Sequence, residues 1–204
     1  ITAANYNMTR ARINNALIFV LDELKDDDSV IADEAGNTEK ENEEKTQSNI
    51  ILFLASNPTK TGKLQLTHEF ARLSQQLQDT DFRPKMEEAP TFTNLQKFIL
   101  QEKPRIVHFS GHGEKLGEEV KGAINRGGLN IDEEEGDNFD TGLILFSEDL
   151  REPFLVGTDV IKHLFKGMVK IQNIPIETVI FNACHSEAQA EAIAEFVPNV
   201  VGTS

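Results

Sequence analysis

The sequence predicts an α/β fold, a three-layer sandwich in which helices cover both faces of a mainly parallel β-sheet. Short apolar runs of strand length alternate with longer stretches whose apolar residues recur at helical spacing. Strands and helices that alternate in this way are joined by right-handed crossovers, which build a parallel sheet between layers of helices. The 204 residues are enough for one such domain with a sizeable core.

Six segments have the length and the residue types of β-strands: 49–56, 81–89, 105–110, 142–149, 177–183 and 199–204. The first, third and fifth are apolar almost throughout, which predicts buried strands. The second is a weaker strand, and the fourth is predicted to be one arm of a hairpin. The sixth begins one further strand.

Helices are predicted between these strands, where apolar residues repeat every three or four positions. The helical segments are 64–78, 93–101, 156–170 and 186–196. Ser186 and Gln189 have the spacing of a capping box, so the last helix is expected to begin at Ser186.

Composition divides the chain into three parts. Residues 1–25 carry apolar side chains at helical spacing, which predicts an N-terminal amphipathic helix. Residues 26–48 are acidic, polar and free of aromatic side chains, which is the composition of a linker. Residues 49–204 form the predicted α/β domain, which is interrupted by an acidic insert at 114–141.

The net charge of −14 is concentrated in two segments. Residues 22–45 carry eleven Asp or Glu and three Lys, and residues 114–140 carry nine Asp or Glu and three Lys or Arg. The rest of the chain is neutral. No basic face is therefore predicted to neutralise phosphates, which argues against nucleic acid as a direct partner. Both acidic segments have the composition of solvated, flexible stretches.

The single cysteine, Cys184, excludes an internal disulfide. The sequence contains no run of 18 apolar residues, and its first residues lack the basic and apolar regions of a secretory signal. These features predict a cytoplasmic protein that does not bind a membrane. Because the chain begins with Ile1, we expect it to be a fragment of a longer protein.

Reactive side chains follow two of the predicted buried strands, and the carboxyl ends of strands are where sites on parallel sheets lie. The first strand leads into Gly111-His112-Gly113, where two glycines allow a substrate to approach the backbone closely. The second strand leads into Cys184, directly before a predicted helix. The partial positive charge of a helix N-terminus stabilises a thiolate.

A cysteine and a histidine are the minimum for nucleophilic acyl transfer. The thiolate of Cys184 would attack a carbonyl carbon, and the imidazolium of His112 would protonate the leaving amine. The backbone N–H groups of Gly113 and Cys184 are candidate donors to the oxyanion that develops. We therefore expect His112 and Cys184 to face each other across adjacent parallel strands.

Other interpretations of these residues stay open. Cys184 is compatible with a buried structural thiol, and His112 with an ordinary turn histidine. His108 lies within its strand and is expected to be a packed or hydrogen-bonded residue, whereas His185 is expected to face solvent or to contact substrate. A zinc site that includes both His108 and His112 is disfavoured, because two strand residues four positions apart are separated by roughly 13 Å, too far to bind one ion. Segment 58–64 is similar to a phosphate loop but lacks its first glycine and its Ser or Thr.

The motifs IVHFSGHG and VIFNACHSEAQAEAIA, preceded by ILFLASNP and LQLTHEFARL, resemble the CHAT domain, a branch of the caspase-like cysteine peptidases. The resemblance extends from Ile50 to Ser204. It implies a caspase-like fold and a cysteine endopeptidase that cleaves a protein substrate. By this resemblance His112 is the catalytic histidine, Cys184 is the nucleophile and Gly113 contributes to the oxyanion hole.

The same resemblance places Asn182 near the floor of the pocket for the residue that precedes the cut, and His185 is a further candidate for this substrate pocket. CHAT domains are typically effectors of bacterial proteins that also carry sensor modules. We therefore expect a role in bacterial defence or signalling, with activation by a sensor module or a partner chain and without a metal or organic cofactor. The competing interpretation is a catalytically silent interaction module that keeps the caspase-like fold.

The sequence departs from the family pattern at two places. Family members pass from the histidine motif to the hairpin in a few residues, whereas 114–141 intervene here. This insert is either an inert loop or a segment that covers the cleft. The family fold also continues beyond the last residue, so we expect the C-terminal part of the domain to be missing or to be supplied by another chain.

Overall fold

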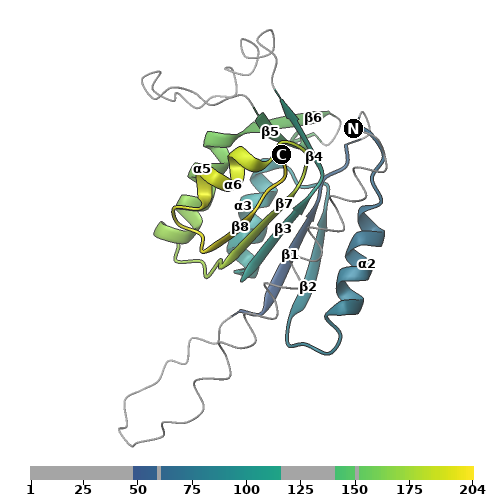
Figure 1. Cartoon of the computed structure of the whole chain (residues 1–204), viewed down its shortest axis with the longest axis vertical. Coiled ribbons are helices and arrows are strands. Elements are labelled where there is room, and N and C mark those ends of the chain that lie inside the picture. Colours follow the sequence, from purple (N-terminus) through teal and green to yellow (C-terminus); the bar gives the residue numbers. More distant parts are fainter. Residues whose placement is uncertain (1–47, 59–60, 116–140, 150–151) are drawn as a thin grey trace, which may run out of the picture. The chain divides into compact units, whose positions relative to one another are not determined.

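In the structure of the protein, a computed structural model, five parallel strands form a sheet in the order β2-β1-β3-β7-β8 (Figure 1). The strands are β1 (Ile50–Ala55), β2 (Arg83–Glu88), β3 (Ile106–Ser110), β7 (Thr178–Asn182) and β8 (Asn199–Val201). Each of them falls within a segment predicted to be a strand. The mainly parallel sheet of the predicted α/β fold is therefore confirmed.

The structure describes residues 48–58, 61–115, 141–149 and 152–204. The predicted helix at 1–25, nearly all of the linker at 26–48 and most of the insert at 114–141 lie outside the described residues. The division of the chain into these parts therefore stays a prediction. Residues 48–204 form one compact unit.

Helices cover both faces of the sheet. On one face lie α3 (Phe92–Glu102), α5 (Thr158–Lys166) and α6 (Glu187–Ile193), and Figure 1 shows α2 (Leu66–Gln76) on the other. Alternate residues of β1 make this division visible. Leu52 and Leu54 join the buried core with residues of α3, α5 and α6, whereas the ring of Phe53 lies 5.5 Å from that of Phe70 in α2. The three layers predicted from the sequence are present.

A second, antiparallel sheet of three strands has the order β4-β5-β6. Its strands are β4 (His112–Lys115), β5 (Thr141–Phe146) and β6 (Pro153–Gly157). The predicted hairpin arm is β5. Strand β4 was not predicted, because its four residues contain no apolar side chain.

The predicted helix at 156–170 is wrong at its start. Val156 belongs to β6, where it pairs with Leu143, and α5 begins at Thr158. The helix continues beyond Lys166 as a π-helical turn, Gly167–Ile171. Among the described residues, no helix is both long enough and apolar enough to cross a membrane.

Two isoleucines, one in α5 and one in the π-helical turn that follows it, should contribute very differently to the free energy of unfolding. Ile161 is fully buried in the core, whereas Ile171 is 74% exposed. Replacing Ile161 with Ala should lower the free energy of unfolding by about 2–5 kcal/mol, because the lost methyl groups leave a cavity. The same change at Ile171 should alter it by about 0.5 kcal/mol or less. Guanidinium denaturation of both variants measures the difference, and equal losses would contradict this description of the core.

Candidate active site

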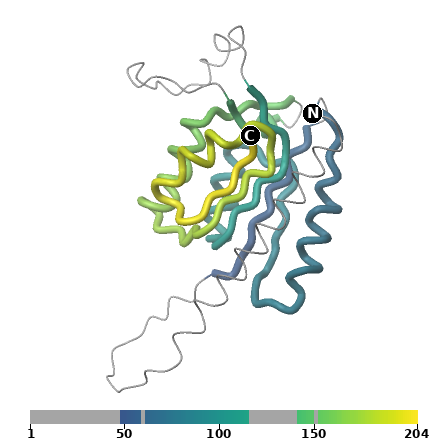
Figure 2. The backbone as a smooth tube through the Cα atoms, viewed as in Figure 1, coloured from purple at the N-terminus to yellow at the C-terminus, as the bar shows by residue number. Residues whose placement is uncertain are grey.

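The two predicted motifs follow neighbouring strands. Strands β3 and β7 pair in parallel with Ser110 opposite Asn182, so their carboxyl ends lie at the same edge of the sheet. Figure 2 shows the two strands side by side. The segment that follows β3 stays in contact with β7, since the amide of Gly111 donates a hydrogen bond to the carbonyl of Asn182 (3.2 Å).

The motifs also approach each other closely at Gly113 and Cys184. A Cβ atom placed on Gly113 would lie 1.9 Å from the carbonyl oxygen of Cys184 and 3.4 Å from the Cβ atom of Ala183. No side chain fits in this space, so glycine is required here for steric reasons. The structure therefore brings the residue after His112 into backbone contact with Cys184.

His112 is the first residue of β4 and is half-buried. Its Nε2 atom lies 2.7 Å from the carbonyl oxygen of Gly62. A carbonyl oxygen can only accept a hydrogen bond, so Nε2 carries the proton. In the neutral ring the other nitrogen, Nδ1, then has a free lone pair, which is the requirement for a general base.

Gly62 belongs to the segment 58–64, which lacks the first glycine and the Ser or Thr of a phosphate loop. Just before it, the amide and the hydroxyl of Thr61 both donate to the carbonyl of Pro58. With the Asn57 amide oriented to satisfy both of its neighbours, Nδ2 donates to the Gly62 carbonyl (3.0 Å) and Oδ1 accepts from the Leu64 amide (3.2 Å). This segment thus presents one oriented carbonyl to the His112 ring.

Cys184 lies in the turn between β7 and α6 and is half-buried. The next residue, His185, has a φ angle of 57°, in the left-handed region that non-glycine residues rarely adopt. Such conformations persist only where the surrounding structure holds them, and they are concentrated at functional sites. His185, which was predicted to contact substrate or face solvent, is half-buried in this turn.

The buried side chain of Ser186 stabilises this turn by hydrogen bonds. Its fully buried hydroxyl lies within donating distance of the carbonyls of Phe181 (3.0 Å) and Ala183 (2.8 Å) and accepts a hydrogen bond from the amide of Thr203. The hydroxyl of Thr203 donates to the same Ala183 carbonyl. The segment after β8 is therefore bonded to the turn that carries Cys184.

The predicted capping box at Ser186 is wrong. Helix α6 does follow Ser186 directly, but the Ser186 side chain makes no capping hydrogen bond, because its hydroxyl is used by the preceding turn. The side chain of Gln189 instead donates to the hydroxyls of Thr141 (3.0 Å) and Thr158 (2.7 Å).

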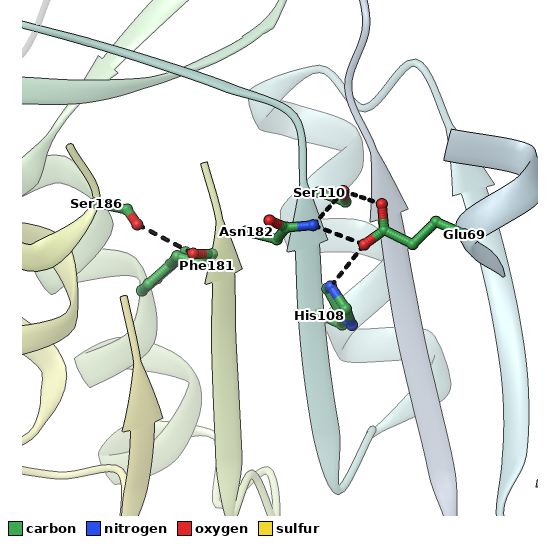
Figure 3. A network of polar contacts seen from close by, with 6 residues as sticks. All are labelled: Glu69, His108, Ser110, Phe181, Asn182 and Ser186. Carbon is green, nitrogen blue, oxygen red and sulfur yellow. Dashed lines mark hydrogen bonds and ion pairs between the residues drawn. The ribbon is translucent and has the colours of Figure 1, made fainter. Parts of the chain in front are cut away.

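A buried polar cluster lies below the strand ends (Figure 3). Asn182, predicted to lie near the pocket floor, is buried and donates from Nδ2 to Glu69 Oε1 (2.7 Å) and Ser110 Oγ (3.2 Å). His108 is buried too, with Nε2 3.4 Å from Glu69 Oε1 and its ring 4.8 Å from that of Phe53. The prediction that His108 is a packed residue of the strand is confirmed.

Glu69, which was not predicted to be a site residue, joins this cluster from α2. A signal was present, because Glu69 lies on the apolar side of its helix, between Leu66 and Leu73, which are both buried. A carboxylate at such a position needs polar partners in the interior. Among the described residues, no group of three or more His, Cys, Asp or Glu is arranged to hold a metal ion.

The chain was also compared with models of protein families and with curated proteins. The sequence model of a protein family, described as the CHAT domain, matches residues 26–201. No curated protein matches the chain.

The contact between Gly113 and Cys184 generates a prediction. Replacing Gly113 with Ala should lower the free energy of unfolding by about 1–3 kcal/mol, because the new Cβ must displace the Cys184 backbone. Gly167 supplies the control, since a Cβ atom there meets nothing within 4 Å and the residue has helical angles. Gly167→Ala should raise the free energy by about 0.4–1 kcal/mol. Equal stability of the two variants in guanidinium denaturation would disprove the contact.

Proposed function

Because the chain belongs to the CHAT domain family, a family of caspase-like cysteine peptidases, we propose that it hydrolyses peptide bonds in a protein substrate. Cys184 is the proposed nucleophile, and His112 is the proposed general base and acid. The observation that carries this proposal is the backbone contact of Gly113 with Cys184 at the ends of two adjacent parallel strands. Two motifs from distant parts of the sequence meet there.

In the first half of the reaction, Nδ1 of His112 accepts the thiol proton and the sulfur of Cys184 attacks the carbonyl carbon of the substrate. The C–N bond then breaks, and the imidazolium transfers its proton to the leaving amine. The products of this half are a free amine and a thioester on Cys184. Water attacks the thioester while Nδ1 accepts its proton, and the released thiolate recovers that proton as the carboxylic acid product leaves.

The Gly62 carbonyl supports this use of His112. It fixes the proton on Nε2 of the neutral ring, so the nitrogen left to exchange protons with sulfur is always Nδ1. When the ring becomes positively charged, the same hydrogen bond is between a cation and a carbonyl, which is stronger than a bond between neutral groups. The carbonyl therefore orients the base.

The negative oxygen of each tetrahedral intermediate needs donors that are already in place. We assign this role to the backbone N–H groups of Gly113 and Cys184, whose residues are in contact. Asn182 and His185 are the proposed residues of the pocket for the side chain that precedes the cut. Asn182 is buried, and His185 directly follows Cys184 in the turn, which supports this assignment.

Two further features are proposed on the family resemblance alone. The protein substrate would be cleaved as part of a bacterial defence or signalling response. A sensor module or partner chain would switch on the activity. No cofactor takes part in the proposed reaction, since every proton transfer in it uses His112.

The dyad is tested by alkylation, because Cys184 is the single cysteine of the chain. Iodoacetamide should label the unmodified protein at neutral pH, and His112→Ala should slow labelling by about 10²-fold, the scale of a general-base contribution. His163→Ala is the matched control, since His163 is an exposed histidine on α5. Its labelling rate should stay unchanged.

Cleavage of a peptide library by the same proteins completes the test. Both Cys184→Ala and His112→Ala should abolish cleavage while the circular dichroism spectrum stays that of the unmodified protein. Full cleavage by Cys184→Ala would rule out the peptidase mechanism. Labelling that is indifferent to His112 would favour a catalytically silent interaction module.

A further inference from the structure

We propose that Glu69 is a positioning residue, which fixes the spacing between His112 and Cys184 by joining the ends of the strands that carry them. Glu69, Ser110 and Asn182 together form what we call the strand-end brace. This inference rests on the proposed function, since it concerns the geometry of the same two side chains.

The carboxylate of Glu69 bonds to both strands at once (Figure 3). Its Oε2 accepts a hydrogen bond from the hydroxyl of Ser110 in β3 (3.0 Å), and its Oε1 accepts one from the amide of Asn182 in β7 (2.7 Å). The Asn182 amide also donates to the Ser110 hydroxyl (3.2 Å), so the three side chains form a closed triangle. One group from α2 therefore restrains both strand ends.

The place of the brace in the sequence connects it to the dyad. Ser110 stands two residues before His112, and Asn182 stands two residues before Cys184. Ser110 and Asn182 are also direct partners in the parallel pairing of β3 with β7. Each member of this pair is only two positions away from His112 or Cys184. A change in the distance between Ser110 and Asn182 would therefore change the distance between the imidazole and the sulfur.

Stability alone gives no reason for a carboxylate at this place. The Glu69 side chain is only 5% exposed, and transferring a charge to such a site costs several kcal/mol unless partners satisfy it. Apolar residues that fill the same volume often stabilise a fold as well or better. What the planar group adds is direction, because its two polar atoms bond at fixed geometry to the two different strands.

The opposite ends of the same strands supply a matched control. Arg105 precedes β3 and Glu177 precedes β7, and Arg105 Nε lies 2.7 Å from Glu177 Oε2. This pair also joins the two strands through a charge-assisted contact, and the Arg105 side chain is only 4% exposed. It lies at the amino ends, away from His112 and Cys184.

The experiment compares iodoacetamide labelling of Cys184 in four proteins: unmodified, Glu69→Ala, Glu69→Gln and Glu177→Ala. Rates are measured across the pH range, each protein with and without His112→Ala, and thermal denaturation confirms that every variant is folded at the assay temperature. The ratio of rates with and without His112 isolates the contribution of the imidazole, which a loss of stability in a folded protein does not change.

For Glu69→Ala, the His112-dependent ratio should fall about 10- to 100-fold, as expected when a catalytic group is displaced by an ångström or less. Glu69→Gln should retain most of the ratio, since its amide can accept from Asn182 and donate to the Ser110 hydroxyl. Glu177→Ala should keep the ratio within about twofold even though it lowers the melting temperature.

Three results would overturn the inference: an unchanged ratio in Glu69→Ala, equal losses in Glu69→Gln and Glu69→Ala, or an equal loss in Glu177→Ala. If Glu69→Ala does not fold, Ser110→Ala decides in its place, and its ratio should fall at least about threefold. Failure of the proposed function gives a different result, because the unmodified protein would then show no dependence on His112.

Discussion

The parallel pairing of β3 with β7 is the constraint on which the site depends. Parallel strands end at the same edge of a sheet, so the segments that carry His112 and Cys184 both begin at this edge. The pairing itself is held by burial, because Val107, Phe109, Val179 and Phe181 belong to the hydrophobic core. The hydrophobic effect thus fixes the place of the site.

Backbone contacts then refine this placement. Glycine is needed at Gly111 and Gly113, because a Cβ atom on the former would lie 2.8 Å from the Ser56 carbonyl and one on the latter would overlap the Cys184 carbonyl. Separate elements hold His112 and Cys184: the carbonyl of Gly62 bonds to the His112 ring, and the segment after β8 bonds to the turn that carries Cys184. Together with the contact between Gly113 and Cys184, these bonds restrain both segments.

Most of the fold could be predicted from the sequence, because burial leaves a repeating pattern of apolar residues. That signal is strong for β1, β3 and β7, whose residues are almost all buried. It fails for β4, which is a strand only because it pairs with β5, and for β6, whose five residues run directly into α5. Pairing with a distant strand is not visible in a segment of four or five residues.

The site could be predicted only as far as its side chains carry the chemistry. His112 and Cys184 stand out by residue type, and Glu69 could have been found as a carboxylate on an apolar helix face. Gly62 could not, because every residue has a carbonyl and only the folded chain selects the one that meets the imidazole. The capping role predicted for Ser186 was wrong for a similar reason, since its hydroxyl can bond either to the helix that follows or to the turn that precedes it. In the turn its single proton lies within reach of two carbonyls while its oxygen accepts from the amide of Thr203, so the hydroxyl both donates and accepts there, whereas as a cap it would accept one bond. In this candidate site the sequence indicates which side chains could react, and the backbone around them sets their orientation.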